Sequence, residues 1–167
     1  MASGQTLIPF TPQMGEPPAS AYATLDTRNG HLVADFDDTT DEALVFKAIM
    51  PQNYAATTGV TVYIHYAMSS ATANAAGWQV AFERTSDSIQ DIDADGFAAV
   101  QSVSVTVPAT SGHVDITSIA FTQGAQMDSV VAGDGFRLKI NRDADGSAVT
   151  DSATGDAELW AIEVRET

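Results

Sequence analysis

Apolar and polar residues alternate along much of this chain with a period of two, which is typical of β-strands covered on one face. From Val60 to Met68, for example, every second residue is large and apolar. β-Branched and aromatic residues fill most of these positions, as strands favour. Trp78 and Trp160 fall in the apolar phase of their segments and are expected to point into the core. The segments with the clearest alternation are 60–68, 78–83, 102–107, 136–141 and 160–165.

Weaker patterns add further strands and two short helical turns. In the segment 113–121 the apolar phase slips between Ile116 and Ile119, which indicates a bulge. Asn29-Gly30 is a strong hairpin signal between two short strands. The weaker strands are expected at 23–28, 32–36, 42–49 and 113–121, and the helical turns at 95–100 and 125–131.

These elements predict an all-β protein with its strands in two packed sheets or a barrel. We predict a two-sheet antiparallel β-sandwich with eight or nine strands and one or two helical turns. This single domain would span residues 24–167. Residues 1–23 are predicted to form an extended, proline-rich N-terminal arm, because proline interrupts helices and central strands. Either this segment is a frayed terminus, or its apolar side chains dock on a partner or a neighbouring subunit; these side chains are Leu7, Ile8, Phe10 and Met14.

Composition narrows the classes of partner. Seven Lys and Arg against 22 Asp and Glu give a net charge of −15, so no basic stripe is available for nucleic acid and anionic membranes would repel the chain. No apolar run is long enough to cross a bilayer, and the first residues lack the features of a signal peptide. The absence of cysteine excludes disulfides, thiolate catalysis and cysteine-based zinc sites.

One acidic segment has the spacing of a metal loop. Residues 91–96 read D-x-D-x-D-G, which is how an EF-hand calcium loop begins. The twelfth position is Ser102, which supplies no bidentate carboxylate, so an EF-hand is excluded. Asp91, Asp93 and Asp95 stay candidate ligands of a looser calcium site, and the alternative is a solvated acidic turn. No other cofactor is expected.

No catalytic motif stands out. The chain has no G-x-S-x-G elbow, no H-E-x-x-H pair and no phosphate-binding glycine loop, so a non-enzymatic protein is expected. Many β-sandwiches bind carbohydrate through exposed aromatic side chains. Tyr54, near a strand end, and Tyr63, in an outward phase, are the candidates for such a platform.

Several segments of the chain resemble one class of viral protein. The chain is similar to structural proteins of tailed-bacteriophage virions, including capsid decoration and head-fibre-like β-sandwich proteins. The segments that carry the resemblance are 36–42, 50–54, 62–67, 81–84, 136–143, 155–160 and 163–166.

This resemblance implies a virion protein with a jelly-roll-like β-sandwich on the capsid exterior, made in the host cytoplasm. It further implies a homo-oligomer, preferably a trimer, with the major capsid protein as partner. The first hypothesis is therefore a capsid decoration protein that binds and stabilises a phage head, with the apolar arm as its contact. The alternative is a carbohydrate-binding β-sandwich module for host recognition, as part of a fibre or tail.

Overall fold

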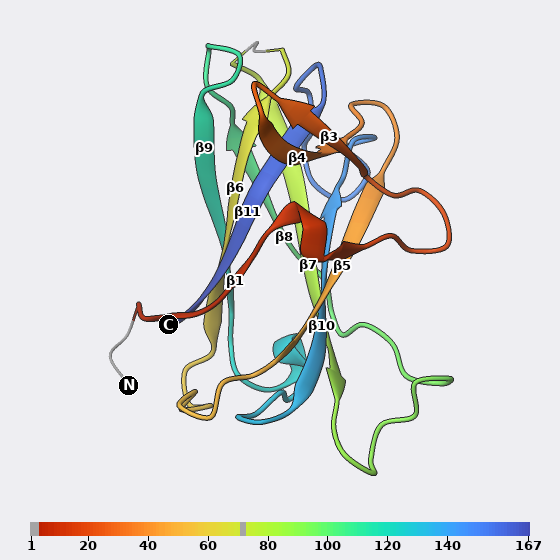
Figure 1. Cartoon of the computed structure of the whole chain (residues 1–167), viewed down its shortest axis with the longest axis vertical. Coiled ribbons are helices and arrows are strands. Elements are labelled where there is room, and N and C mark those ends of the chain that lie inside the picture. Colours follow the sequence, from red (N-terminus) through yellow and green to blue (C-terminus); the bar gives the residue numbers. More distant parts are fainter. Residues whose placement is uncertain (1–3, 71–72) are drawn as a thin grey trace.

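Eleven strands form two antiparallel sheets that pack face to face in the part of the chain that the structure describes, residues 4–70 and 73–167 (Figure 1). The structure is a computed structural model. The strands are β1 (Thr6–Phe10), β2 (Gly15–Glu16), β3 (Thr24–Arg28), β4 (His31–Phe36), β5 (Glu42–Ile49), β6 (Val60–Met68), β7 (Ala75–Thr85), β8 (Gln101–Thr106), β9 (Val114–Phe121), β10 (Gly135–Arg142) and β11 (Ala157–Glu166). One sheet has the order β3-β4-β11-β6-β9, with β1 also paired to β11, and the other has the order β2-β5-β10-β7-β8. The predicted all-β, jelly-roll-like sandwich is confirmed.

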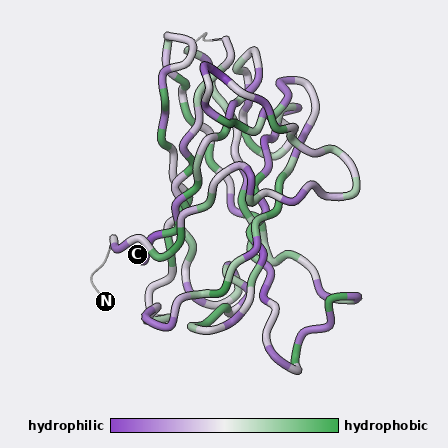
Figure 2. The backbone as a smooth tube through the Cα atoms, in the orientation of Figure 1, coloured by the Kyte–Doolittle hydropathy of each residue, from purple (hydrophilic) through white to green (hydrophobic). Residues whose placement is uncertain are grey.

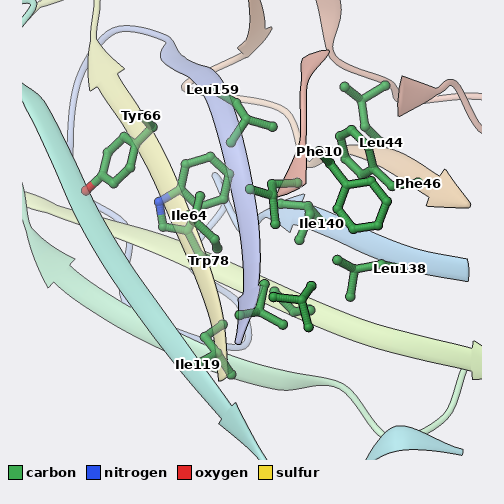
Figure 3. Packing of buried hydrophobic residues seen from close by; sticks show 14 of the residues in the cluster. Phe10, Leu44, Phe46, Ile64, Tyr66, Trp78, Ile119, Leu138, Ile140 and Leu159 are labelled. Atoms are coloured by element: carbon green, nitrogen blue, oxygen red, sulfur yellow. The ribbon is translucent and has the colours of Figure 1, made fainter. Parts of the chain in front are cut away.

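The core lies between the two sheets and is built from the apolar phase of the alternating strands. On β6, Val62, Ile64 and Tyr66 are fully buried. Trp78 of β7 meets Phe36 and Tyr66 edge to face, with ring centroids 5.3 and 5.2 Å apart. Figure 3 shows Trp78 and Tyr66 within the buried cluster, and Figure 2 shows hydrophobic and hydrophilic positions alternating along the strands. A period of two therefore reports correctly which face of most strands is buried.

The predicted N-terminal arm is a part of the sandwich instead. β1 pairs antiparallel with β11, which places Ile8 and Phe10 in the core and leaves Leu7 partly buried against it. Pro9 is tolerated because β1 has only one partner strand, so no ladder hydrogen bond is lost on its other side. Of the four predicted contact residues, Met14 alone is largely exposed, at 46%. The boundary at residue 23 is corrected accordingly.

Three smaller expectations also need correction. β9 pairs with β6 in an unbroken register, so the predicted bulge is absent from it; Thr117 takes the inward position and Ile116 faces outward. Residues 95–100 form no helix, whereas Ala125–Met127 and Pro12–Met14 each form a 3₁₀ turn. The short strands β1 and β2 raise the number of strands above the predicted eight or nine. Among the described residues, no helix is long and apolar enough to cross a membrane.

A buried ion pair organises the long loop between β10 and β11. Arg142 is fully buried, and its Nε donates to Oδ2 of Asp151 at 2.9 Å. The same guanidinium donates to the backbone carbonyls of Phe36, Ala153 and Gly155 at 2.8–3.2 Å. One side chain therefore ties the loop to the end of β4, next to the sheet that carries the candidate site.

Candidate functional site

The outer face of the six-stranded sheet carries an exposed tryptophan at a bulge in β11. Leu159 pairs with Tyr66 and Ala161 pairs with His65, so Trp160 is an extra residue between two consecutive ladder positions. The insertion shifts the phase of the strand by one residue and turns the indole outward, where it is 45% exposed. The predicted inward position of Trp160 is wrong for this reason.

The sequence does contain a signal for this bulge. The apolar positions of β11 change phase between Leu159 and Ile162, because Ile162 lies three positions after Leu159 rather than two or four. Ile162 and Val164 are buried and lie two and four positions after Trp160. An alternation counted from Trp160 therefore places Trp160 in the buried phase and misses the change.

Trp160 forms one wall of a cleft of about 380 Å³. The cleft gathers segments that are distant in sequence: the β3–β4 hairpin, the end of β6, the loop before β9, and β11. Its floor and walls combine apolar groups with a few charged and polar ones, as ligand sites typically do. The lining residues are Arg28, Asn29, His31, Val33, Ala67, Gly112, Val114, Glu158 and Trp160.

Arg28 holds the polar end of this cleft in place. Its guanidinium forms a salt bridge with Glu158 and donates to the backbone oxygen of Met68 at 2.9 Å and to Oγ of Ser111 at 2.8 Å. Gly112 packs against the guanidinium with a φ of +77°, and an added Cβ would lie 2.9 Å from an arginine nitrogen. This backbone conformation favours glycine, and a larger residue here would push on the guanidinium of Arg28. The result is a guanidinium and a carboxylate fixed side by side at the cleft.

Asp35 lies beside this pair, opposite Glu158 on the neighbouring strand. Its Oδ1 is buried without a hydrogen-bond partner. Burial, and then repulsion by the carboxylates of Glu158, Asp26 and Asp156, raise the pKa of Asp35 from 3.8 to about 6, against the opposing influence of Arg28. The ionised form of Asp35 is thus disfavoured in the folded protein.

We expect Asp35→Asn to make the protein more stable at neutral pH. Because the folded-state pKa lies above the unfolded one, the stability contributed by neutral Asp35 is complete below pH 4 and is lost as the pH rises through 6. The gain at pH 7 is about 1–2 kcal/mol after allowing for solvent screening, and it vanishes near pH 4. Urea unfolding between pH 4 and 8, in the presence of EDTA, measures it.

The loop variant Asp93→Asn serves as the control for this pH series, since Asp93 is exposed. It should change the free energy of unfolding by less than about 0.5 kcal/mol. An Asp35→Asn protein that is no more stable than the wild type at pH 7 would contradict the assigned environment of Asp35.

The two tyrosines proposed as a platform do not meet. Tyr54 is buried, and its hydroxyl donates to Oε1 of Gln123 at 2.6 Å. Burial, with a further contribution from Glu166, raises the pKa of Tyr54 to about 12. Tyr63 does face outward from β6, and the guanidinium of Arg165 stacks on its ring at 4.2 Å. Of the predicted pair, Tyr63 alone lies on the face that carries Trp160.

The predicted calcium ligands do not converge either. Asp91, Asp93 and Asp95 lie exposed in the loop between β7 and β8, and Asp93 donates its backbone N–H to Oδ1 of Asp91. Within the described residues, other carboxylates come together so that their oxygens lie within 4.8 Å of one another. These two groups are Asp37, Asp38 and Asp156, and Asp41, Asp143 and Asp145.

Both carboxylate groups consist of oxygen donors, the ligand type that calcium prefers. Several of these oxygens already accept hydrogen bonds from backbone N–H groups, which offset part of their mutual repulsion. Asp38 accepts from Gly155 at 2.6 Å, and the buried Asp143 accepts from Ala148 and Val149 at 3.0 and 2.6 Å. The groups therefore also have a structural explanation, as anchors of the loops at this end of the sandwich.

A second cleft, of about 420 Å³, lies on the five-stranded sheet beneath the 86–100 loop, which projects from the sandwich in Figure 1. Its lining includes Lys47, which pairs with Glu16 at 2.7 Å, and Arg137, which pairs with the buried Glu83, and its aromatic side chain, Phe136, is buried. The Trp160 cleft combines an exposed aromatic ring with partly exposed polar groups, so it is the better candidate for ligand binding.

The chain matches no protein-family model and no curated protein sequence. Among solved structures, it is similar to a family 35 carbohydrate-binding module from an environmental isolate, with a TM-score of 0.54 and 12% identity over 95% of this chain and 92% of the other. The CBM35 of Abf62 from Cellvibrio japonicus has a TM-score of 0.56 and 11% identity, over 95% of this chain and 92% of the module. The xylan-binding module CBM15 has a TM-score of 0.51 and 9% identity, over 96% of this chain and 97% of the module. At such identities, the likeness shows a shared fold.

These comparisons overturn the predicted function as a capsid decoration protein. The similar solved structures described above are carbohydrate-binding modules and not virion proteins. The resemblance to tailed-phage proteins is carried by short segments only. The capsid-protein partner, the trimer, the virion location and the absence of catalysis stay predictions, because a single chain tests none of them.

Proposed function

We propose that this protein is a carbohydrate-binding β-sandwich module whose ligand packs on Trp160. The observation that carries the proposal is the indole itself, which is exposed at the mouth of a cleft with a fixed guanidinium–carboxylate pair. The solved structures with this fold support it, since several of them are carbohydrate-binding modules.

Apolar surface around Trp160 favours a ligand with an apolar face. Val114 and Ile116 of β9 are 53% and 54% exposed on the same side of the sheet, next to Ala67 and His65 of β6. Grouped exposed apolar side chains mark binding surfaces more often than single ones do. A pyranose ring presents C–H groups on one face, and these pack well on an indole.

The polar groups of the cleft match the rest of such a ligand. Sugar hydroxyls both donate and accept hydrogen bonds. The carboxylate of Glu158 accepts them, the guanidinium of Arg28 donates them, and His31 at the hairpin can do either. Because Arg28 is held by three other groups, little side-chain entropy remains to be lost on binding.

Trp160→Ala is expected to weaken glycan binding at least tenfold, because it removes the ring on which the sugar packs. A glycan array that includes xylan, arabinogalactan and β-1,3-galactan identifies the ligand, and isothermal titration calorimetry compares the variants. A similar fold occurs in a xylan-binding module, and also in parts of an exo-β-1,3-galactanase and of an enzyme with specificity for decorated arabinogalactans, of which this chain covers 29% and 18%.

The matched control is Ile49→Ala, which removes an exposed apolar side chain from the opposite sheet. It should bind as the wild type does. An array without any hit, or a Trp160→Ala variant that binds with unchanged affinity, would exclude the proposed function.

A further inference from the structure

The Trp160 cleft continues into a strip of ordered side chains along β6 and β11. Pairing across β9, β6 and β11 arranges the outer face in four successive rows. Their central members are Ala67, His65, Tyr63 and Thr61 of β6. The rows are Val114–Ala67–Glu158, Ile116–His65–Ala161, Ser118–Tyr63–Glu163 and Ala120–Thr61–Arg165. From Ala67 to Thr61 the strip is about 20 Å long at ~3.3 Å per residue.

Aromatic rings occupy the middle of this strip. His65 meets Trp160 edge to face, with ring centroids 5.8 Å apart. Two residues further along β6, Tyr63 carries the stacked guanidinium of Arg165, 4.2 Å from the ring centroid. Trp160, His65 and Tyr63 thus follow one another from the cleft toward the far end of the strip.

Hydrogen bonds hold the far end rigid. Arg165 donates to Glu163 at 2.6 Å, and Glu163 also accepts from the hydroxyl of Thr6 on β1. The His65 ring lies 3.9 Å from the same carboxylate. Preorganised rings and donors bind a ligand at lower entropic cost than mobile ones do. The strip is therefore ordered over its whole length and not at the cleft alone.

The strip carries no excess of positive charge, because its two guanidinium groups face two carboxylates and Asp35 lies beside Glu158; the whole chain has a net charge of −15. Glu158 is paired with Arg28 at one end, and Glu163 is paired with Arg165 at the other. Burial lowers the pKa of His65, which favours its neutral form. A polyanionic ligand would meet no excess of positive charge here and would be repelled by the rest of the surface.

We propose that the site binds an internal segment of a neutral, linear polysaccharide, laid along β6 and β11 from the Arg28–Glu158 end to the Tyr63–Arg165 end. This inference rests on the proposed function and adds the class of ligand. A strip of this length accommodates several pyranose rings in line, with Trp160 and Tyr63 contacting different sugars of one chain.

The test measures affinity against ligand length. Xylo-oligosaccharides, β-1,4-gluco-oligosaccharides and β-1,3-galacto-oligosaccharides from the disaccharide to the hexasaccharide are titrated calorimetrically into wild type, Tyr63→Ala and Arg165→Gln. Wild-type affinity for the series that binds should rise beyond the disaccharide. Both variants should bind the pentasaccharide with about tenfold lower affinity than the wild type, and the disaccharide with nearly the same affinity. Circular dichroism establishes that each variant is folded.

Leu25→Ala is the control, because Leu25 is exposed on the same sheet but lies on β3, outside the strip. Affinity that is already maximal for the disaccharide, or an unchanged length dependence in both variants, overturns the inference while leaving the proposed function intact. Tighter binding of oligogalacturonate than of any neutral series also overturns it. Failure of every glycan on the array to bind rejects the proposed function itself.

Discussion

Replacing Arg142 by methionine will lower the free energy of unfolding by about 3–5 kcal/mol, the usual loss when one partner of a buried ion pair is removed. Asp151 would stay behind as a buried charge without its partner. The carbonyls of Phe36, Ala153 and Gly155 would lose their donor as well, since the guanidinium now serves all three. Urea denaturation followed by tryptophan fluorescence measures this loss.

A second variant separates the pair from the packing of its aliphatic stem. In the double variant Arg142→Met, Asp151→Asn, no charge is left buried, so part of the lost stability should return. If the single variant loses less than about 1 kcal/mol, the pair is more hydrated than its burial indicates. Arg142 does not line the Trp160 cleft. The single variant should therefore weaken glycan binding only to the extent that it unfolds the protein.

Replacing Phe10 by alanine is the other change with a large expected effect, again about 3–5 kcal/mol of stability. Phe10 is 1% exposed, and its ring centroid lies 5.4 Å from that of Phe46 on the opposite sheet. β1 therefore joins the two layers of the sandwich, as Figure 3 shows for these two rings. Thermal and urea unfolding measure the change.

Met14→Ala provides the comparison within the same N-terminal segment, and it should cost less than about 0.5 kcal/mol because Met14 is largely exposed. An arm that docked only on a partner would leave the stability of the isolated chain nearly unchanged in both variants. Equal and small losses in the free energy of unfolding for both variants would therefore support the separate arm that the sequence predicts.

Much of the fold follows from residues that are near one another in the chain. On β6 and β10 the alternation alone identifies the buried face, and Phe136, Leu138 and Ile140 are all buried as expected. The same phase continues to Arg142, whose burial could have been inferred from its position. The pairing of Arg142 with Asp151 could not have been inferred, because nothing in the local pattern relates a loop carboxylate to the end of a strand.

The candidate site was less accessible from the sequence. Tyr63 was placed correctly on an outward face, since that depends only on the phase of β6. Tyr54 was not, because residues outside regular strands carry no periodic signal of burial. Asp91, Asp93 and Asp95 matched a motif by spacing, but their loop does not fold the side chains toward a common point.

The sequence by itself determined that this chain is all-β, with its strands in two packed sheets or a barrel, and it determined the buried face of most strands, because side-chain direction within a strand repeats every two residues. Only the tertiary structure decided that Trp160 points outward, that β1 belongs to the core, and that Arg28, Gly112 and Glu158 meet at one cleft. Each of these depends on how one strand is aligned with another, and the free energy of that alignment lies in contacts between residues far apart in the chain.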